Sequence, residues 1–330
     1  MSGKAMLTIR SIFLKKTQCL GMFAAFSLWL PAMYGQVTTG TILGHVSDSS
    51  GASITDAAVR ITEVSKNTLS NTRTDSNGNY SAPFLIPGTY TIRVEKEGFK
   101  SSTQTDLILQ VDQKATANFI LEVGNVSESI EVTASAALVR SESAELGEVI
   151  ETRAVRELPL NGRNFAQLVY LNPGVTPGQA GENLSGASTF NPRGASNFNA
   201  LGSRANTNAW LIDGIDNNEF TYNTVLISPT VESVREFKTL TGIFSAEFGR
   251  GAGVVSVSTQ SGSNEFHGNL FEFHRNHVLD ARAWNAPAGQ RKPVFRRNQY
   301  GGAIGGPVIL PKIYDGRNKT FFFFDYAGMR

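Results

Sequence analysis

The sequence predicts a mainly β protein with three folded parts: a small β-sandwich, an α+β domain and the first strands of a transmembrane β-barrel. Three observations indicate this fold class. Short β-branched runs separated by turn residues occupy 40–122, helical and extended patterns mix over 141–260, and longer alternating segments with clustered aromatic residues follow from 261. With 330 residues, 41% of them hydrophobic and 18% charged, the chain can build more than one core.

The first 35 residues have the composition of a secretory signal peptide. Four basic residues precede an uncharged run from Cys19 to Leu30. This run is shorter than the roughly 20 apolar residues of a membrane-spanning helix, so export is favoured and an N-terminal anchor helix is the alternative. Cys19 is the only cysteine of the chain. Removal of the segment would therefore leave no thiol for disulfides, zinc ligation or catalysis.

The segment 40–122 has the pattern of strands separated by turns. Tyr90, Ile92 and Val94 alternate with polar neighbours, as in a strand with one buried face. Asn77-Gly78 favours a tight turn with positive φ. The polar side chains of 75–79 fit this turn better than a calcium loop, because the glycine stands fourth where such a loop requires it sixth. Regularly spaced strands without a helical period predict a small β-sandwich.

Several residues of this region form an ordered series of short motifs: Gly-x-Val, Asp-x-x-Gly-x-Tyr, Leu-x-Pro-Gly-x-Tyr-x-Ile-x-Val and Gly-Phe. The series resembles the carboxypeptidase-regulatory-like, transthyretin-like sandwich. This resemblance implies an accessory module without peptidase chemistry. The residues that carry it are Gly44, Val46, Asp75, Gly78, Tyr80, Leu85, Pro87, Gly88, Tyr90, Ile92, Val94, Gly98 and Phe99.

The composition changes after Val123, where a short polar segment with extended propensity follows. Such a segment can add as a strand to the open edge of a partner's sheet, because backbone groups make the pairing. Its residues Glu128-Ser-Ile-Glu-Val-Thr-Ala134 form an acidic-x-Ile-x-Val-Thr-Ala motif. This motif resembles the TonB box, through which TonB-dependent receptors contact the energy-transducing protein TonB. Its place before the next domain favours this interpretation over a last sandwich strand or a plain linker. The resemblance implies a partner-binding site at Glu128, Ser129, Ile130, Glu131, Val132, Thr133 and Ala134.

The α+β domain is predicted from a helix over 148–158, a second short helix capped by Asn164, and strands at 209–214, 234–240 and 254–259. Loops rich in glycine and asparagine separate these elements. The order resembles the plug domain of TonB-dependent receptors, although the family's usual Arg-Gly-Pro is replaced by Thr-Leu-Thr-Gly. The motifs that carry the resemblance are Arg193-Gly194, Leu211-Ile-Asp-Gly214, Val231 to Phe237, Glu247-Phe-Gly249 and Gly253-Val-Val255.

Alternating strands are predicted at 264–275, 298–310 and 319–326, with Phe271 and Phe273 on one face of the first. Aromatic residues clustered at a lipid interface are typical of transmembrane barrels. The phrase Gln-Tyr-Gly-Gly-Ala-Ile-Gly-Gly-Pro, followed by Lys-Thr-Phe-Phe-Phe, resembles Oar-like receptors. A plugged barrel has about 22 strands, so the chain is interpreted as the N-terminal part of a longer protein. A truncated product that is unable to close a barrel is a further alternative.

No arrangement for catalysis is predicted. The glycine clusters at 249–253 and 301–306 lack the lysine-serine ending of a phosphate-binding loop, and no Gly-x-Ser-x-Gly elbow is present. His274 and His277 would point to opposite faces of a strand, so they are not expected to chelate a metal together. We therefore expect no enzymatic activity, no cofactor and no metal. The formal charge of +2 does not indicate a nucleic-acid partner.

The resemblances imply an outer-membrane receptor that takes up an oligosaccharide, a peptide or a metal chelate, with a plug that moves when TonB pulls on the box. The implied partners are TonB with its inner-membrane energising complex, outer-membrane lipid and an extracellular nutrient. The alternative is a non-transporting surface protein that binds or adheres through its sandwich. The expected division is a signal peptide at 1–35, a periplasmic sandwich at 36–123, the TonB-box linker at 124–140, the plug at 141–260 and the start of the barrel at 261–330.

Overall fold

The described part of the chain begins after the predicted signal peptide. The computed structural model describes residues 39–125, 129–133, 145–178, 197–220, 223–248, 251–282, 284–287, 289 and 291–330. Every described residue lies within the unit Val37–Arg330. The predicted signal peptide and the Arg193-Gly194 motif lie outside the described residues. Among the helices that are described, none has the length and apolarity needed to span a membrane.

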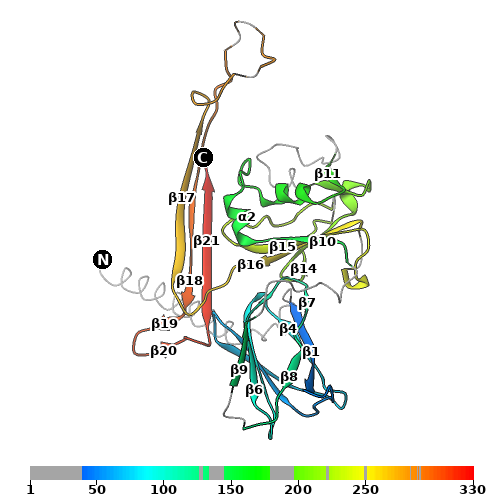
Figure 1. The fold of residues 1–330 in the computed structure, drawn as a ribbon. Helices are drawn as coiled ribbons and strands as arrows, with labels where there is room; N and C mark the ends of the chain where they lie inside the picture. The colour runs from blue at the N-terminus through cyan, green and yellow to red at the C-terminus, as the bar shows by residue number, and fades with distance from the viewer. Residues whose placement is uncertain are drawn as a thin grey trace, which may run out of the picture. The chain divides into compact units, whose positions relative to one another are not determined.

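The first domain is a β-sandwich (Figure 1). One sheet has the order β4-β1-β7, with β8 also paired to β1, and the other has the order β3-β2-β5-β6-β9. Ile42 from the first sheet and Ile61 and Ile92 from the second are fully buried in one apolar cluster, so the core lies between the two sheets. The strands are β1 (Gly40–Asp48), β2 (Ala58–Glu63), β3 (Thr68–Arg73), β4 (Asn79–Leu85), β5 (Gly88–Glu95), β6 (Ser101–Leu109), β7 (Lys114–Thr116), β8 (Phe119–Leu121) and β9 (Ser129–Thr133).

The structure confirms the predicted sandwich. Its strand β6 begins at Ser101 and ends at Leu109. Strand β3 is not predicted by the sequence, because its side chains are all exposed or half-buried. Polar strands of this kind form because a neighbour supplies backbone partners, here β2 over its whole length. Such strands therefore have no alternation of hydrophobic and polar residues from which they could be predicted.

The polar segment 75–79 is a turn, as predicted. The side-chain Oδ1 of Asp75 accepts hydrogen bonds from the backbone N–H groups of Asn77 at 2.8 Å and Asn79 at 2.9 Å. Gly78 adopts a positive φ of 76°, which a glycine tolerates without steric cost. The carboxylate oxygen is thus used to close the turn.

Gly44 lies where no side chain fits. A Cβ at this position would come within 1.9 Å of the Ala117 carbonyl oxygen, which also accepts the hydroxyl of Tyr80 at 2.6 Å. We expect Gly44→Ala to lower the free energy of unfolding of the sandwich by about 1–3 kcal/mol, measured by urea denaturation. Gly124→Ala is the control, because the three atoms nearest to its methyl all belong to the flexible side chain of Lys100 and not to backbone. Equal stability of both variants would contradict this packing.

The second domain is built on a five-stranded sheet with the order β10-β15-β16-β13-β14. β13 and β16 run parallel, whereas β15 is antiparallel to both β16 and β10. β16 is buried along almost its whole length, as a central strand should be. The elements are β10 (Gly147–Ile150), α2 (Thr152–Glu157), the 3₁₀ helix η1 (Phe165–Leu171), β11 (Val175–Pro177), β12 (Phe198–Ala200), η2 (Ala205–Thr207), β13 (Ala209–Ile212), β14 (Ile215–Asp216), β15 (Val234–Thr241), η3 (Ala246–Phe248) and β16 (Gly253–Thr259).

One predicted element of this domain is partly wrong. The helix expected over 148–158 begins only at Thr152, because Gly147–Ile150 pair with β15 as strand β10. Val149 and Ile150 are β-branched and suit a strand, and Ile150 is buried against the sheet opposite Phe237. The second helix is confirmed: Asn164 caps η1 by accepting the Ala166 N–H at 3.1 Å.

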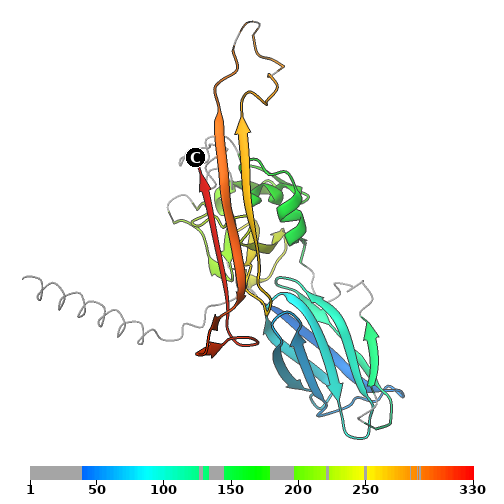
Figure 2. The same cartoon turned by 90° about the vertical axis from the view of Figure 1, so that its left-hand side faces the viewer.

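The last part is a three-stranded antiparallel sheet of long strands, β17-β18-β21, drawn in yellow to red in Figure 2. β17 (His267–Asn276), β18 (Arg296–Pro307) and β21 (Phe321–Met329) pair in unbroken register, and a short ribbon of β19 (Ile309–Leu310) and β20 (Tyr314–Asp315) lies between the last two. The glycines of β18 let backbone and rings approach closely: a Cβ at Gly301 would lie 2.1 Å from the Tyr326 carbonyl oxygen. Strands of this length and pattern are the expected start of a barrel wall.

Candidate functional site

The predicted TonB-box residues occupy the edge of the sandwich. Ser129–Thr133 form β9, which pairs in parallel with β6 from Ser101↔Ser129 to Thr105↔Thr133. Glu128 and Ala134 lie outside the described residues. The backbone of the central five residues is thus extended and hydrogen-bonded to a neighbouring strand. Extended backbone at a sheet edge is the form in which a segment can pair with a further strand.

The loop before η1 packs against β17 through the side chain of Arg163. The guanidinium of Arg163 forms an ion pair with Glu232, which is 4% exposed. The same guanidinium lies 4.4 Å from the ring centroid of Phe271 and 4.5 Å from that of Phe273. A cation over aromatic faces is attracted to both rings. We call Arg163, Glu232, Phe271 and Phe273 the arginine latch.

Backbone geometry and further hydrogen bonds support the latch. Gly162 and Arg163 both have positive φ, 74° and 54°, and this sharp turn directs the arginine toward β17. The side chain of Gln299 in β18 donates to the Gly162 carbonyl at 3.2 Å. Thr230 donates its hydroxyl to Asp325 of β21 at 2.6 Å. All three long strands therefore contact the α+β domain, β17 through two phenylalanine rings and β18 and β21 through polar side chains.

A second polar contact connects the sandwich with strand β15. The carboxylate of Glu236 accepts the Val111 N–H at 2.5 Å, and Lys238 donates to the Asp112 carbonyl at 3.1 Å and to Glu145 at 2.9 Å. Burial raises the pKa of Glu236, although the hydrogen bond from Val111 opposes this shift. Burial also raises the pKa of Asp112. The charged form of both carboxyls is thus disfavoured where they contact the sheet.

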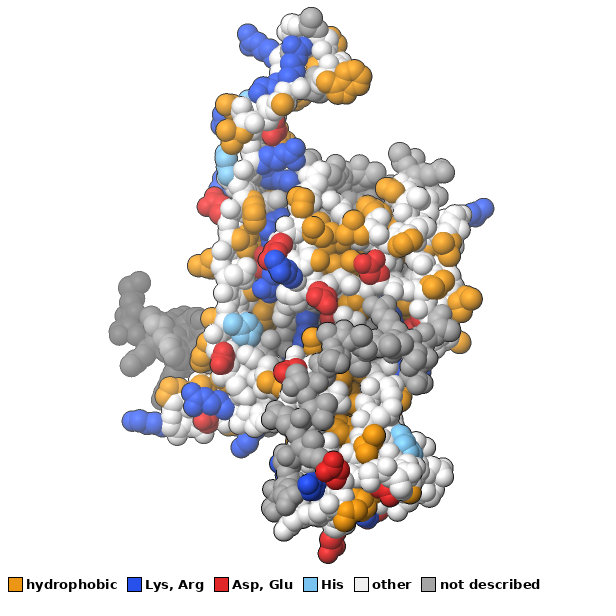
Figure 3. All heavy atoms as spheres, viewed as in Figure 1, with side chains coloured by type: hydrophobic (Ala, Val, Ile, Leu, Met, Phe, Trp, Pro, Cys, Tyr) orange, Lys and Arg blue, Asp and Glu red, His pale blue; other side chains and the backbone are white. Residues whose placement is uncertain are grey.

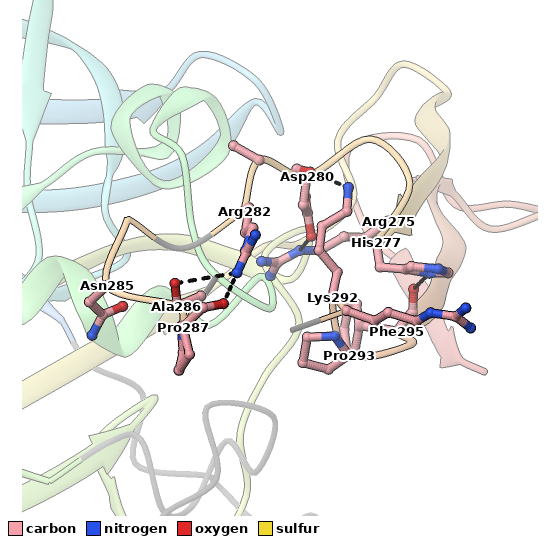
Figure 4. A pocket seen from close by; sticks show the side chains of 12 residues that line it. Arg275, His277, Asp280, Arg282, Asn285, Ala286, Pro287, Lys292, Pro293 and Phe295 are labelled. Carbon is pink, nitrogen blue, oxygen red and sulfur yellow. Dashed lines mark hydrogen bonds and ion pairs between the residues drawn. The ribbon is translucent and has the colours of Figure 1, made fainter. Parts of the chain in front are cut away.

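Basic side chains gather on the loop that joins β17 and β18 (Figure 3). The stretch 275–297 carries six basic residues and one acidic residue, Asp280. A hollow of about 580 Å³ that is open to solvent lies along this loop, and Figure 4 shows the side chains that line it. Within it, Lys292 donates to the Asp280 carbonyl at 2.8 Å and Arg282 donates to the carbonyls of Ala286 and Pro287. The excess of positive charge favours an anionic group at this surface.

No cluster of metal-binding side chains occurs in the part of the chain that the structure describes. His274 and His277 make separate contacts, to the Asn298 side chain at 2.5 Å and to the Phe295 carbonyl at 3.2 Å. Asp213 of the Leu-Ile-Asp-Gly motif accepts the N–H and the hydroxyl of Thr259 at 2.9 and 2.6 Å, which fixes the end of β16. The latch and the contacts of Glu236 were missed in the sequence, because their partners are far apart in the chain and no local pattern relates them.

Three family models match successive parts of the chain. The carboxypeptidase regulatory-like domain matches residues 41–122, the TonB-dependent receptor plug domain matches 141–255 and the outer membrane β-barrel domain matches 258–330. A sandwich, a plug and barrel strands in this order define the class of protein. The chain belongs to the TonB-dependent receptors.

Within this class, the chain is similar to the TonB-dependent transporter Oar of Myxococcus xanthus. The two are 26% identical over 319 residues, which cover 92% of this chain and 28% of that protein. The chain thus spans about 28% of the length of its curated relative.

Solved structures give only partial likenesses. Hydroxyquinol 1,2-dioxygenase from Pseudomonas putida DLL-E4 is 10% identical with a TM-score of 0.23, covering 28% of this chain and 58% of that one. The streptococcal ancillary pilin is 14% identical, also with a TM-score of 0.23, and the match covers 27% of this chain and 34% of the pilin. Scores this low carry no argument about function, and the family matches indicate a transporter receptor rather than an enzyme.

Proposed function

We propose that the chain is the N-terminal part of an outer-membrane receptor for active uptake of a nutrient, coupled to TonB through residues 128–134. The family matches and the transporter relative support this role. The observation that carries the proposal is an extended segment, β9, which is the edge strand of a sandwich sheet and precedes the matched plug domain in the chain. Force applied to this segment would reach the plug through the connecting chain. The transported compound would be an oligosaccharide, a peptide or a metal chelate.

The proposal includes a location and a division of the chain. The receptor would be exported by the signal peptide at 1–35 and inserted into outer-membrane lipid by its barrel. The sandwich at 36–123 would remain in the periplasm, together with the box linker at 124–140. There it would meet TonB and its inner-membrane energising complex. The plug at 141–260 would close the barrel that starts at 261–330, and the nutrient would bind from outside.

The first experiment tests the box directly. We expect a synthetic peptide of residues 123–140 to cause saturable chemical-shift changes on an edge strand of the C-terminal domain of TonB from the same organism. Ile130→Pro should weaken binding at least about tenfold, because proline removes a backbone donor from the added strand. Asn125→Pro, outside the box, is the control and should bind normally. Absence of shifts at millimolar peptide would remove TonB coupling from the proposal.

The alternative, a non-transporting surface or adhesion protein, makes a different prediction. Such a protein would keep its surface binding in cells that lack TonB. For the receptor, we expect nutrient-dependent growth to be lost both on deletion of 128–134 and on loss of TonB. Growth that is unaffected by either change would favour the alternative.

A further inference from the structure

Strand β9 is held in place from its upstream side. Val123 pairs with Phe99 as an isolated bridge, and the Gly124 N–H donates to the Gly98 carbonyl at 3.1 Å. The Lys100 N–H donates to the Glu122 carbonyl at 2.8 Å. The chain therefore crosses to the second sheet from a fixed point before it reaches Ser129. The five paired residues of β9 are then ordered by β6 along their whole length.

Among the described strands, β6 alone pairs with β9. The sheet has the order β3-β2-β5-β6-β9, so β9 is its last strand. Along a strand, successive residues direct their N–H and C=O groups to alternate edges. Half of the backbone groups of β9 therefore face away from β6. The outer edge of a last strand is a template for a further strand.

We propose that a partner's edge strand adds to the outer edge of β9 while β9 stays paired with β6, so that the sandwich is part of the docking surface. This inference rests on the proposed function, in which the partner is TonB. Ordering a free segment opposes binding, and a segment already held in its bound conformation avoids that cost. The sandwich would thus present the box to its partner as a strand that is already formed.

A disulfide across the register tests whether β9 must leave the sandwich. Gln104 and Val132 are direct partners in the β6–β9 pair, and neighbouring strands lie at the spacing that a disulfide needs. The double variant Gln104→Cys/Val132→Cys, in a Cys19→Ser background of the full chain, would lock β9 onto β6 when oxidised. Gln104→Cys alone is the control. The probe is the C-terminal domain of TonB from the same organism.

We expect the oxidised chain to bind this domain with a Kd within about threefold of the reduced chain. We also expect the full chain to bind about tenfold more tightly than the peptide 123–140, because the peptide must be ordered on binding. Binding that is lost on oxidation and restored by dithiothreitol would overturn the inference, since the box would then have to detach. So would a full chain that binds more weakly than the peptide.

The comparison separates this inference from the proposed function. If the peptide and the reduced chain both bind, the proposed coupling holds, and the oxidised chain alone decides whether the sandwich takes part. If neither binds, the coupling itself fails and the inference fails with it. Circular dichroism of the oxidised variant should match that of the control, which shows that the sandwich is folded.

Discussion

Replacing Arg163 by Met will loosen the contact between the plug and β17 and destabilise the chain by about 3–5 kcal/mol, the usual cost of leaving one member of a buried ion pair without its partner. Glu232 is 4% exposed, so its carboxylate cannot regain full hydration. The contacts with the rings of Phe271 and Phe273 are lost as well. The loss should appear as a lower urea midpoint and as faster protease cleavage of the loop around Gly162.

Two further variants show whether burial causes this effect. Arg153 forms an ion pair with Glu157 in α2, but both side chains are well exposed, so Arg153→Met should cost at most about 0.5 kcal/mol. The double variant Arg163→Met/Glu232→Leu should recover part of the loss, because a buried pair can be replaced by apolar groups at little cost. An Arg163→Met chain as stable as Arg153→Met would show that the latch does not hold the plug.

Phe237→Ala should unfold the plug under mild conditions. Its ring is completely buried in the central strand β15 and packs edge-on against Phe165, with centroids 5.6 Å apart. Truncating such a ring leaves a cavity and costs about 3–5 kcal/mol. A plug that has lost this much stability is expected to show a lower thermal midpoint in near-ultraviolet circular dichroism, because Trp210 shares the cluster.

The matched control for Phe237 is a phenylalanine at the surface of the same domain. Phe220 is 92% exposed, so Phe220→Ala removes the same atoms without opening a cavity. Its thermal midpoint should stay close to that of the unchanged chain. If both variants unfold at the same temperature, the cluster around Phe237 is not the core of the plug.

The parts of the fold that the sequence predicts are those with a local physical signal. Alternation at Tyr90, Ile92 and Val94 reflects one buried face, and the structure buries all three. Asn164 as a helix cap and Asp75 as a turn residue both act through hydrogen bonds to backbone two to four residues away. Such contacts are visible in a short window of sequence.

The parts that could not be predicted depend on distant partners. The segment 147–150 becomes a strand because β15 offers it an edge, and this partner lies about 90 residues further along the chain. The parallel pairing of the predicted box with β6 likewise requires the whole sandwich to be in place. The arginine latch brings Arg163, near the start of the plug, into contact with β17, which follows the last strand of the plug in the chain. The binding role of 128–134 stays a prediction.

The positive φ of Arg163 gives its loop a backbone conformation that the latch contacts must stabilise. A residue with a β-carbon loses about 1–2 kcal/mol in the left-handed region, and here the ion pair and the two rings offset that loss. The left-handed conformation of Arg163 therefore depends on contacts with two other parts of the chain, Glu232 and the rings of β17. Removing any one of these contacts would leave less to offset the conformational cost. The backbone geometry of this loop is thus tied to the packing of β17 against it.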